Sequence, residues 1–238
     1  MDNTTKDYAQ GIITGIARIE ESIAAACLRS GRRREEVLLM GVSKFHPIEK
    51  VEHAWKAGLR LFGENRVQEG VEKFQNFHRG NDTRVHLIGS LQRNKAKAAA
   101  VFFDCIQSVD RISLIEELDK VCADRERPLD ILLEYHTGEE SKRGFPDLDS
   151  LLKGAEKALS CKGINLQGLM TMAPFTDDEH AIRGSFRRLR EVREEMEKQF
   201  NKKFPCLSMG MSGDFEIAIE EGSTLVRIGT AIFGERPA

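Results

Sequence analysis

Short apolar runs alternate with amphipathic, helix-like segments along almost the whole chain. The runs have the length and composition of buried strands, and they occupy residues 38–44, 59–64, 84–90, 104–109, 129–136, 166–173, 206–212 and 224–234. Strands that are joined through helices pair in parallel by right-handed crossovers. Eight such units with no spare strand pattern predict a (β/α)8 barrel of the TIM-barrel class. An open doubly wound sheet is disfavoured further, because no GxGxxG follows the first run.

Residues 7–30 predict an additional N-terminal helix, because apolar side chains recur there with helical spacing. These apolar positions are Ile12, Ile16, Ile19, Ile23 and Ala26. Gly31 then ends the helix. No linker and no change of composition divides the 238 residues, so we predict a single domain over 1–238.

The charges of the chain are nearly balanced, since 36 Lys and Arg residues face 38 Asp and Glu residues for a net charge of −2. This balance provides no general attraction to nucleic acid or to anionic membranes. The five cysteines are scattered without a CxxC pair, and the polar N-terminus lacks the apolar core of a secretory signal. No run approaches the length that spans a membrane. These features predict a cytoplasmic protein with reduced thiols and with no nucleic-acid or membrane partner.

Lys44 ends the first apolar run, at the position where barrels of this class place functional side chains. Strand alternation puts Lys44 on the same side as Met40 and Val42. If that side faces the lumen, burial lowers the pKa of the amine and leaves a nucleophile that forms a Schiff base with an aldehyde. The alternative is a lysine whose stem packs while its head reaches solvent.

Small residues follow the seventh run, directly before a helical segment. They are Ser208, Gly210, Ser212 and Gly213. Backbone N–H groups in such a loop, together with the helix dipole, favour an anion, although Asp214 could also cap the helix. Gly229 and Thr230 in the eighth run are placed to close a second side of the same cup. Barrels of this class often bind phosphate at these two loops, so the pattern predicts a phosphate site.

Arg227 alternates with Val226 and Ile228, which places it on the lumenal face of the last strand. A buried arginine needs a partner, and either the carboxylate of Glu64 or an acceptor nitrogen in a ligand ring would serve. A lysine that forms a Schiff base, a phosphate-binding loop pair and a buried arginine together predict a binding site for pyridoxal 5′-phosphate (PLP).

Six segments resemble, in order, the motifs of the PLP homeostasis protein family. They are VSKFHP, LFGENRVQE, HLIGSLQRNK, GLMTMAP, LSMGMSGDFEIAI and VRIGTAIFG. Together they extend over residues 42–234. The resemblance implies a barrel related to that of alanine racemase, with PLP attached to Lys44 as a Schiff base. It also implies a protein that holds PLP reversibly and supplies it to other enzymes.

The resemblance further implies which residues contact PLP. Phosphate contacts fall to Ser208, Ser212, Gly229 and Thr230, with backbone from Met209 and Met211. Arg227 corresponds to the arginine that faces the pyridine nitrogen. The residues implied to line the mouth are Asn65, His86, Gly89 and Met170. The chain departs from the family pattern at Phe45, Arg66 and Ser90, which bears on the ring-face contacts and on the shape of the groove.

The predicted arginine also bears on whether the chain is an enzyme. Arginine stays cationic and only donates hydrogen bonds, so a ring nitrogen that faces it stays unprotonated, and PLP is then a weaker electron sink for chemistry at an amino-acid Cα. In alanine racemase, which the family resembles, a tyrosine from an additional domain serves as the second base. This chain ends at Ala238, just after the eighth run, so we expect it to lack that domain and to be a monomer.

We therefore expect a non-catalytic PLP carrier, with two alternatives. The first is a weak amino-acid racemase that uses Lys44 and a lumenal base such as Tyr135 or His136. Tyr8 lies in the N-terminal helix, in a sequence context that does not match that of the tyrosine base in alanine racemase. The second is an interaction protein whose charged helix, at residues 187–200, is a docking face. No metal is expected, because the six histidines show no paired spacing with carboxylates or thiols.

Overall fold

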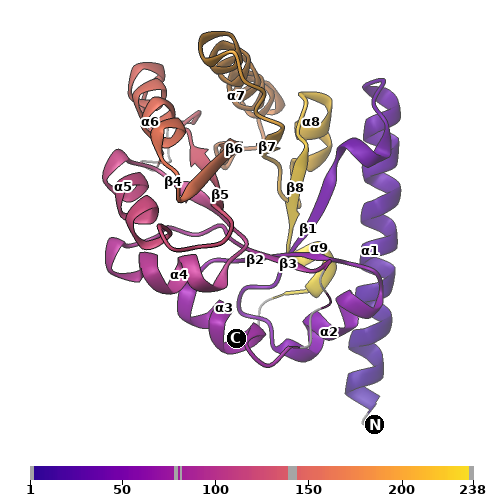
Figure 1. The fold of residues 1–238 in the computed structure, drawn as a ribbon. Coiled ribbons are helices and arrows are strands. Elements are labelled where there is room, and N and C mark those ends of the chain that lie inside the picture. Colours follow the sequence, from indigo (N-terminus) through magenta and orange to yellow (C-terminus); the bar gives the residue numbers. More distant parts are fainter. Residues whose placement is uncertain (1–2, 78–79, 81, 139–143, 236–238) are drawn as a thin grey trace.

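Eight parallel strands close into a barrel in the order β1 to β8. Figure 1 shows the arrangement of strands and helices in this computed structural model, which describes residues 3–77, 80, 82–138 and 144–235. The strands are β1 Leu38–Val42, β2 Leu61–Glu64, β3 Arg84–Leu87, β4 Cys105–Val109, β5 Leu129–Glu134, β6 Ile164–Met170, β7 Cys206–Ser208 and β8 Leu225–Ile228. The pairing of β1 with β8 closes the ring. The (β/α)8 barrel predicted from the alternation is confirmed.

Helices surround the outside of this ring (Figure 1). They are α1 Asn3–Arg29, α2 Ile48–Lys56, α3 Val67–Phe74, α4 Ala96–Phe102, α5 Ile112–Val121, α6 Leu148–Ser160, α7 Glu179–Phe200, α8 Phe215–Glu220 and α9 Thr230–Phe233, with short 3-10 turns at Arg34–Glu36 and Arg93–Lys95. Their apolar faces pack on the outward side chains of the strands and form one large core. A smaller apolar cluster of Cys105, Leu132 and Met170 fills the lumen, as expected of a packed barrel interior.

The additional N-terminal helix is present as α1, which runs along the outside of the barrel beside α2, α8 and α9 (Figure 1). Its apolar stripe is buried, with Ile23 and Ala26 fully covered. Gly15 lets α1 approach α9 closely, since a Cβ there would lie 2.7 Å from the carbonyl oxygen of Ala231. The first helix thereby supports the last one.

The charged helix α7 uses its basic side chains within the molecule. Arg183, Arg187 and Arg190 all reach the carboxylate of Glu221, whose side chain is only 6% exposed, at nitrogen-to-oxygen distances of 3.3, 3.1 and 3.5 Å. The opposite face of α7 packs into the core through residues such as Phe186 and Leu189. These contacts give the charge pattern an intramolecular role, so they do not favour a docking face.

One local prediction is wrong. Strand β8 stops at Ile228, and the apolar residues after it form the short helix α9 rather than more strand. Within the part of the chain that the structure describes, no helix is both long and apolar enough to cross a bilayer.

Candidate functional site

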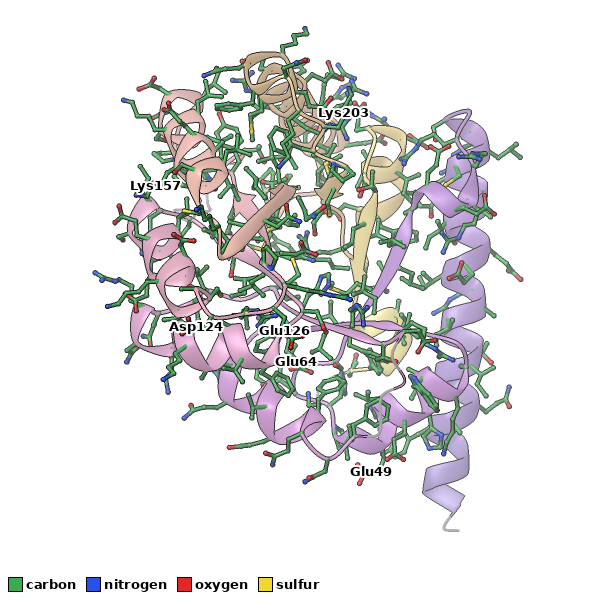
Figure 2. The ribbon with its side chains drawn as sticks, in the orientation of Figure 1. Glu49, Glu64, Asp124, Glu126, Lys157 and Lys203 are labelled. Carbon is green, nitrogen blue, oxygen red and sulfur yellow. The ribbon has the colours of Figure 1, made fainter. Side chains whose placement is uncertain are left out.

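A cavity of about 550 Å³ opens at the C-terminal ends of the strands, the end at which such barrels carry their sites. Side chains occupy the space among the strands and the surrounding helices (Figure 2). Its wall includes Lys44 after β1, Asn65 after β2, Glu134 at the end of β5 and Arg227 on β8. A larger groove of about 950 Å³ lies outside the barrel against α1, α2 and α9, and shares only Thr230 with this cavity.

Lys44 is half-buried and lies two residues beyond the end of β1. Val42 and Lys44 both line the cavity, whereas Gly41 faces Leu59 and Phe233 on the outside of the barrel. The lysine therefore lies on the lumenal side, where strand alternation puts it. The next residue, Phe45, has a φ of 64°, so a tight turn follows the lysine at once.

Backbone donors from two loops face the same cavity. The loop after β7 contributes Ser212 and Gly213, and the end of β8 contributes Gly229 and Thr230. Among the described residues, the N–H groups of these four residues donate to no protein acceptor. Free backbone N–H groups in loops of small residues are suited to an anion such as phosphate.

Asp214 shapes the first of these loops instead of capping α8. Its carboxylate accepts the backbone N–H of Met211 at 2.6 Å, and no side-chain bond caps the helix. Burial raises the pKa of the Asp214 carboxyl, against the bond from Met211 and the charge of Arg227. The loop that faces the cavity is thus closed by a carboxylate that lines it.

Arg227 is almost fully buried, and the hydrogen bonds that its guanidinium makes among the described residues go to neutral oxygens. Its Nη1 donates to the carbonyl and the hydroxyl of Ser208 at 2.8 and 2.7 Å, and its Nη2 donates to the carbonyl of Thr171 at 2.8 Å. Burial lowers the pKa of Arg227 to about 10, so it stays cationic at neutral pH. Of the two partners considered for Arg227, Glu64 bonds to Ser43 and Lys73 instead.

A chain of hydrogen bonds leads from Arg227 into the lumen. Ser208 accepts from Arg227 and donates to Gln107 Oε1 at 2.6 Å, and Gln107 Nε2 lies 2.9 Å from His86 Nδ1. Because Gln107 accepts through its oxygen, its nitrogen is the donor to His86. Burial lowers the pKa of His86 to about 3, so the imidazole is neutral.

The structure brings most of the predicted site residues to one cavity. Those that line it are Lys44, Asn65, Gly89, Met170, Met211, Ser212, Arg227, Gly229 and Thr230. Three others do not: Ser208 and His86 lie in the polar chain beneath it, and Met209 packs in the outer core with its N–H bonded to Leu225. Direct contacts from these three stay predictions, and the observed bonds give them supporting positions.

Several lining residues were not singled out by the sequence. Glu134 ends β5 on the lumenal side, and the loop after β6 adds Phe175 and Asp177, of which Phe175 is 98% exposed. Glu134 could have been found by alternation within residues 129–136. Nothing in the sequence indicates a role for Gln107, which lies beneath the cavity, because an amide on a buried strand belongs to no recognisable motif.

The alternative acid–base residues do not line the cavity. Tyr135 packs in the outer core, and its carbonyl accepts from Thr171 Oγ1 at 2.8 Å. His136 bonds through its backbone to Phe145. No tyrosine or histidine among the described residues lines the cavity, and no group of His, Cys, Asp or Glu there could hold a metal ion.

Comparison with known proteins gives concordant matches. Residues 20–237 match the family model "Alanine racemase, N-terminal domain". The chain is 40% identical over 221 residues to the pyridoxal phosphate homeostasis protein of Aquifex aeolicus, covering 93% of this chain and 96% of that one.

Solved structures agree with these matches. An unknown protein from Bifidobacterium adolescentis superimposes with a TM-score of 0.89 at 35% identity, over 98% of this chain and 97% of that one. PipY of Synechococcus elongatus, solved with PLP bound, superimposes with a TM-score of 0.79 at 35% identity, over 91% of this chain and 100% of that one.

Proposed function

The chain belongs to the pyridoxal phosphate homeostasis protein family, and on that premise we propose that it binds PLP in the cavity at the mouth of the barrel. PLP that is held there takes part in keeping the supply of the free cofactor balanced. The proposal includes covalent attachment through Lys44 and delivery of PLP to other enzymes.

One observation carries this proposal: a half-buried amine, a buried guanidinium and a set of backbone N–H groups share one cavity, and these N–H groups donate to no acceptor among the described residues. The cavity volume of about 550 Å³ is in the range of small-ligand sites. A phosphate group suits the N–H groups of Ser212, Gly213, Gly229 and Thr230. PLP also needs an amine for its aldehyde and a donor for its ring nitrogen, which Lys44 and Arg227 supply.

When it is bound, PLP supplies an aldehyde carbon at which a lysine amine forms a Schiff base with loss of water. Lys44 supplies that amine, and the enclosing wall limits its contact with solvent. The N–H groups of Ser212, Gly213, Gly229 and Thr230 hold the phosphate end of PLP, which confines the position of the ring. Arg227 is itself fixed by three hydrogen bonds, so it offers a donor of fixed direction.

We further propose that holding PLP, rather than turning over an amino acid, is the task of this site. Arg227 stays cationic and has no acceptor atom, so a ring nitrogen that faces it stays unprotonated. PLP with an unprotonated ring nitrogen is a weaker electron sink for chemistry at an amino-acid Cα. Tyr135, a candidate base of the racemase alternative, packs in the outer core and does not line the cavity.

Exchange of the Cα proton tests the catalytic alternative. PLP-loaded protein incubated with L- or D-alanine in deuterated buffer is expected to leave the Cα proton in place, as followed by proton NMR. A tyrosine-containing alanine racemase serves as the positive control. Turnover by this protein that disappears in Lys44→Ala would make it an enzyme and overturn the carrier function.

Delivery is tested by reactivating a PLP-dependent apo-aminotransferase in the presence of a phosphatase that destroys free PLP. Loaded protein is expected to restore activity that the same amount of free PLP does not restore. Equal recovery from both sources would refute delivery. We also propose that the protein is a monomer, which light scattering of the loaded protein checks.

A further inference from the structure

The turn that carries Lys44 rests on three charged side chains that do not line the cavity. They are Glu64 at the end of β2 (labelled in Figure 2) and Glu69 and Lys73 on α3. Lys73 is 7% exposed and Glu64 is fully covered. A buried ammonium must find acceptors for its three protons, so the direction of its bonds is informative.

Lys73 directs its bonds at the turn as well as at the carboxylates. Its Nζ donates to the carbonyl oxygen of Ser43 at 2.7 Å, to Glu64 Oε1 at 2.8 Å and to Glu69 Oε1 at 3.1 Å. The Ser43 hydroxyl donates to the same oxygen of Glu64 at 2.7 Å. Both the carbonyl and the hydroxyl of the residue before Lys44 are therefore held by this cluster.

The residue after Lys44 is held by the same cluster. Glu69 Oε1 accepts the backbone N–H of Phe45 at 2.6 Å. Phe45 has a φ of 64°, a left-handed conformation that a bulky side chain adopts only when the surroundings enforce it. The charge-assisted bond from Glu69 is a local interaction that can enforce it.

The peptide groups on both sides of Lys44 are thus tied to one buried ion cluster. We propose that Glu69 and Lys73 are positioning residues, which fix the turn so that the Lys44 amine enters the cavity in the direction needed to meet an aldehyde. This inference rests on the proposed function, in which Lys44 is the reacting amine.

A purely structural ion pair would look different. Docking α3 on the barrel needs only the bond between Lys73 and Glu64. The bonds from Lys73 to Ser43 and from Phe45 to Glu69 also tie α3 to the barrel, but both end on the backbone of the turn and so restrain the two peptide groups beside Lys44. A structural role predicts lost stability alone, whereas a positioning role predicts a looser turn and slower attachment at Lys44.

The experiment compares three variants on α3. Glu69→Ala removes the acceptor for the Phe45 N–H, Glu69→Gln keeps an acceptor oxygen there, and Glu72→Ala is the matched control on an exposed position of the same helix. The first readout needs no cofactor: hydrogen exchange of the Phe45 amide in PLP-free protein. The second is the rate at which added PLP is trapped on Lys44 by borohydride.

Loss of one charge-assisted hydrogen bond is expected to change each rate by about tenfold. Glu69→Ala should speed Phe45 exchange and slow trapping by that factor, while Glu69→Gln stays within about threefold of the wild type and Glu72→Ala is unchanged. Lys73→Met, which removes the other tie, should slow trapping in the same direction. Its unfolding free energy is measured in parallel to separate misfolding from misplacement.

Equal exchange and equal trapping in Glu69→Ala and Glu72→Ala would overturn the positioning role. If the wild type itself traps no PLP on Lys44, the proposed function fails instead. In that case the exchange readout still decides whether Glu69 holds the turn.

Discussion

Buried polar side chains under the cavity are arranged as one directed series of donors. Arg227 donates to Ser208, Ser208 donates to Gln107, and Gln107 donates to His86. Each bond fixes the role of the next group, so neutral oxygens hold the guanidinium in one orientation. A cation that is fixed in this way at the cavity wall presents the same donors to any ligand.

His86 should make stability depend on pH. Its pKa is about 3 in the folded protein, against 6.5 in the unfolded chain, because burial disfavours the charged ring. In the unfolded chain His86 therefore binds a proton as the pH falls below 6.5, whereas in the folded protein it stays neutral until about pH 3. His86 therefore lowers the unfolding free energy on acidification, beginning as the pH falls below 6.5 and continuing toward pH 3.

Urea unfolding at pH 7, 6 and 5 checks this expectation. His86→Gln should lose less stability on acidification than the wild type, while the exposed His180→Gln serves as the control and should follow the wild type. The same slope in His86→Gln and in the wild type would mean that His86 is not the group responsible.

Asp214 lines the cavity with a carboxylate, which at first sight opposes phosphate. Its carboxylate accepts the Met211 N–H and so holds the loop that offers the N–H groups of Ser212 and Gly213. Asp214→Ala removes that bond and should weaken PLP binding by about tenfold. Asp214→Asn keeps an acceptor and removes the charge, so it should bind PLP at least as tightly as the wild type. Equilibrium titration of all three proteins decides, and tighter binding by Asp214→Ala would contradict the role of the loop.

At the scale of elements, the last helix depends on the first. Helix α9 starts where Gly229 and Thr230 offer their N–H groups, and its other end is tied by Lys50 Nζ, which donates to the Phe233 carbonyl at 2.6 Å. Gly15 of α1 lies against the carbonyl oxygen of Ala231. Helices α1 and α2 thus hold α9 in position from outside the barrel.

Two glycines of α1 test this dependence. A Cβ added at Gly11 would meet no atom within 4 Å, so Gly11→Ala should raise the unfolding free energy by up to about 1 kcal/mol through helix propensity alone. Gly15→Ala places a methyl group 2.7 Å from the Ala231 oxygen and should lower stability and weaken PLP binding. Urea unfolding and PLP titration of both variants measure the effects. Stabilisation by Gly15→Ala with unchanged PLP binding would show that the contact of α1 with α9 does not support the PLP site.

The same elements show what the sequence can and cannot predict. The alternation of runs and helices predicts the barrel, because period and turn signals are local properties. The apolar stretch after Ile228 is equally compatible with a strand, and only its packing against α1 distinguishes the helix α9 from more strand. The polar chain beneath the cavity is hidden from the sequence for another reason: Ser208 and Gln107 are 101 residues apart, and their contact exists only in the closed barrel.

At the scale of the molecule, closing the barrel gathers the loops of distant strands around one opening. Lys44 follows the first strand and Arg227 lies on the last, and the pairing of β1 with β8 brings both to the wall of one cavity. Met170 and Leu132 seal the lumen below, so a ligand enters and leaves at the loop end. A site with one opening suits reversible holding of a small cofactor.

Trapping of PLP with borohydride, followed by peptide mapping, tests the central claim most directly. The competing amine is Lys50, whose pKa is lowered by burial in the outer groove, so Lys50→Ala is the control beside Lys44→Ala. We expect a yellow protein whose reduced adduct maps to Lys44, is absent in Lys44→Ala and persists in Lys50→Ala. A protein that stays colourless with excess PLP, or an adduct that maps to another lysine, would contradict the account.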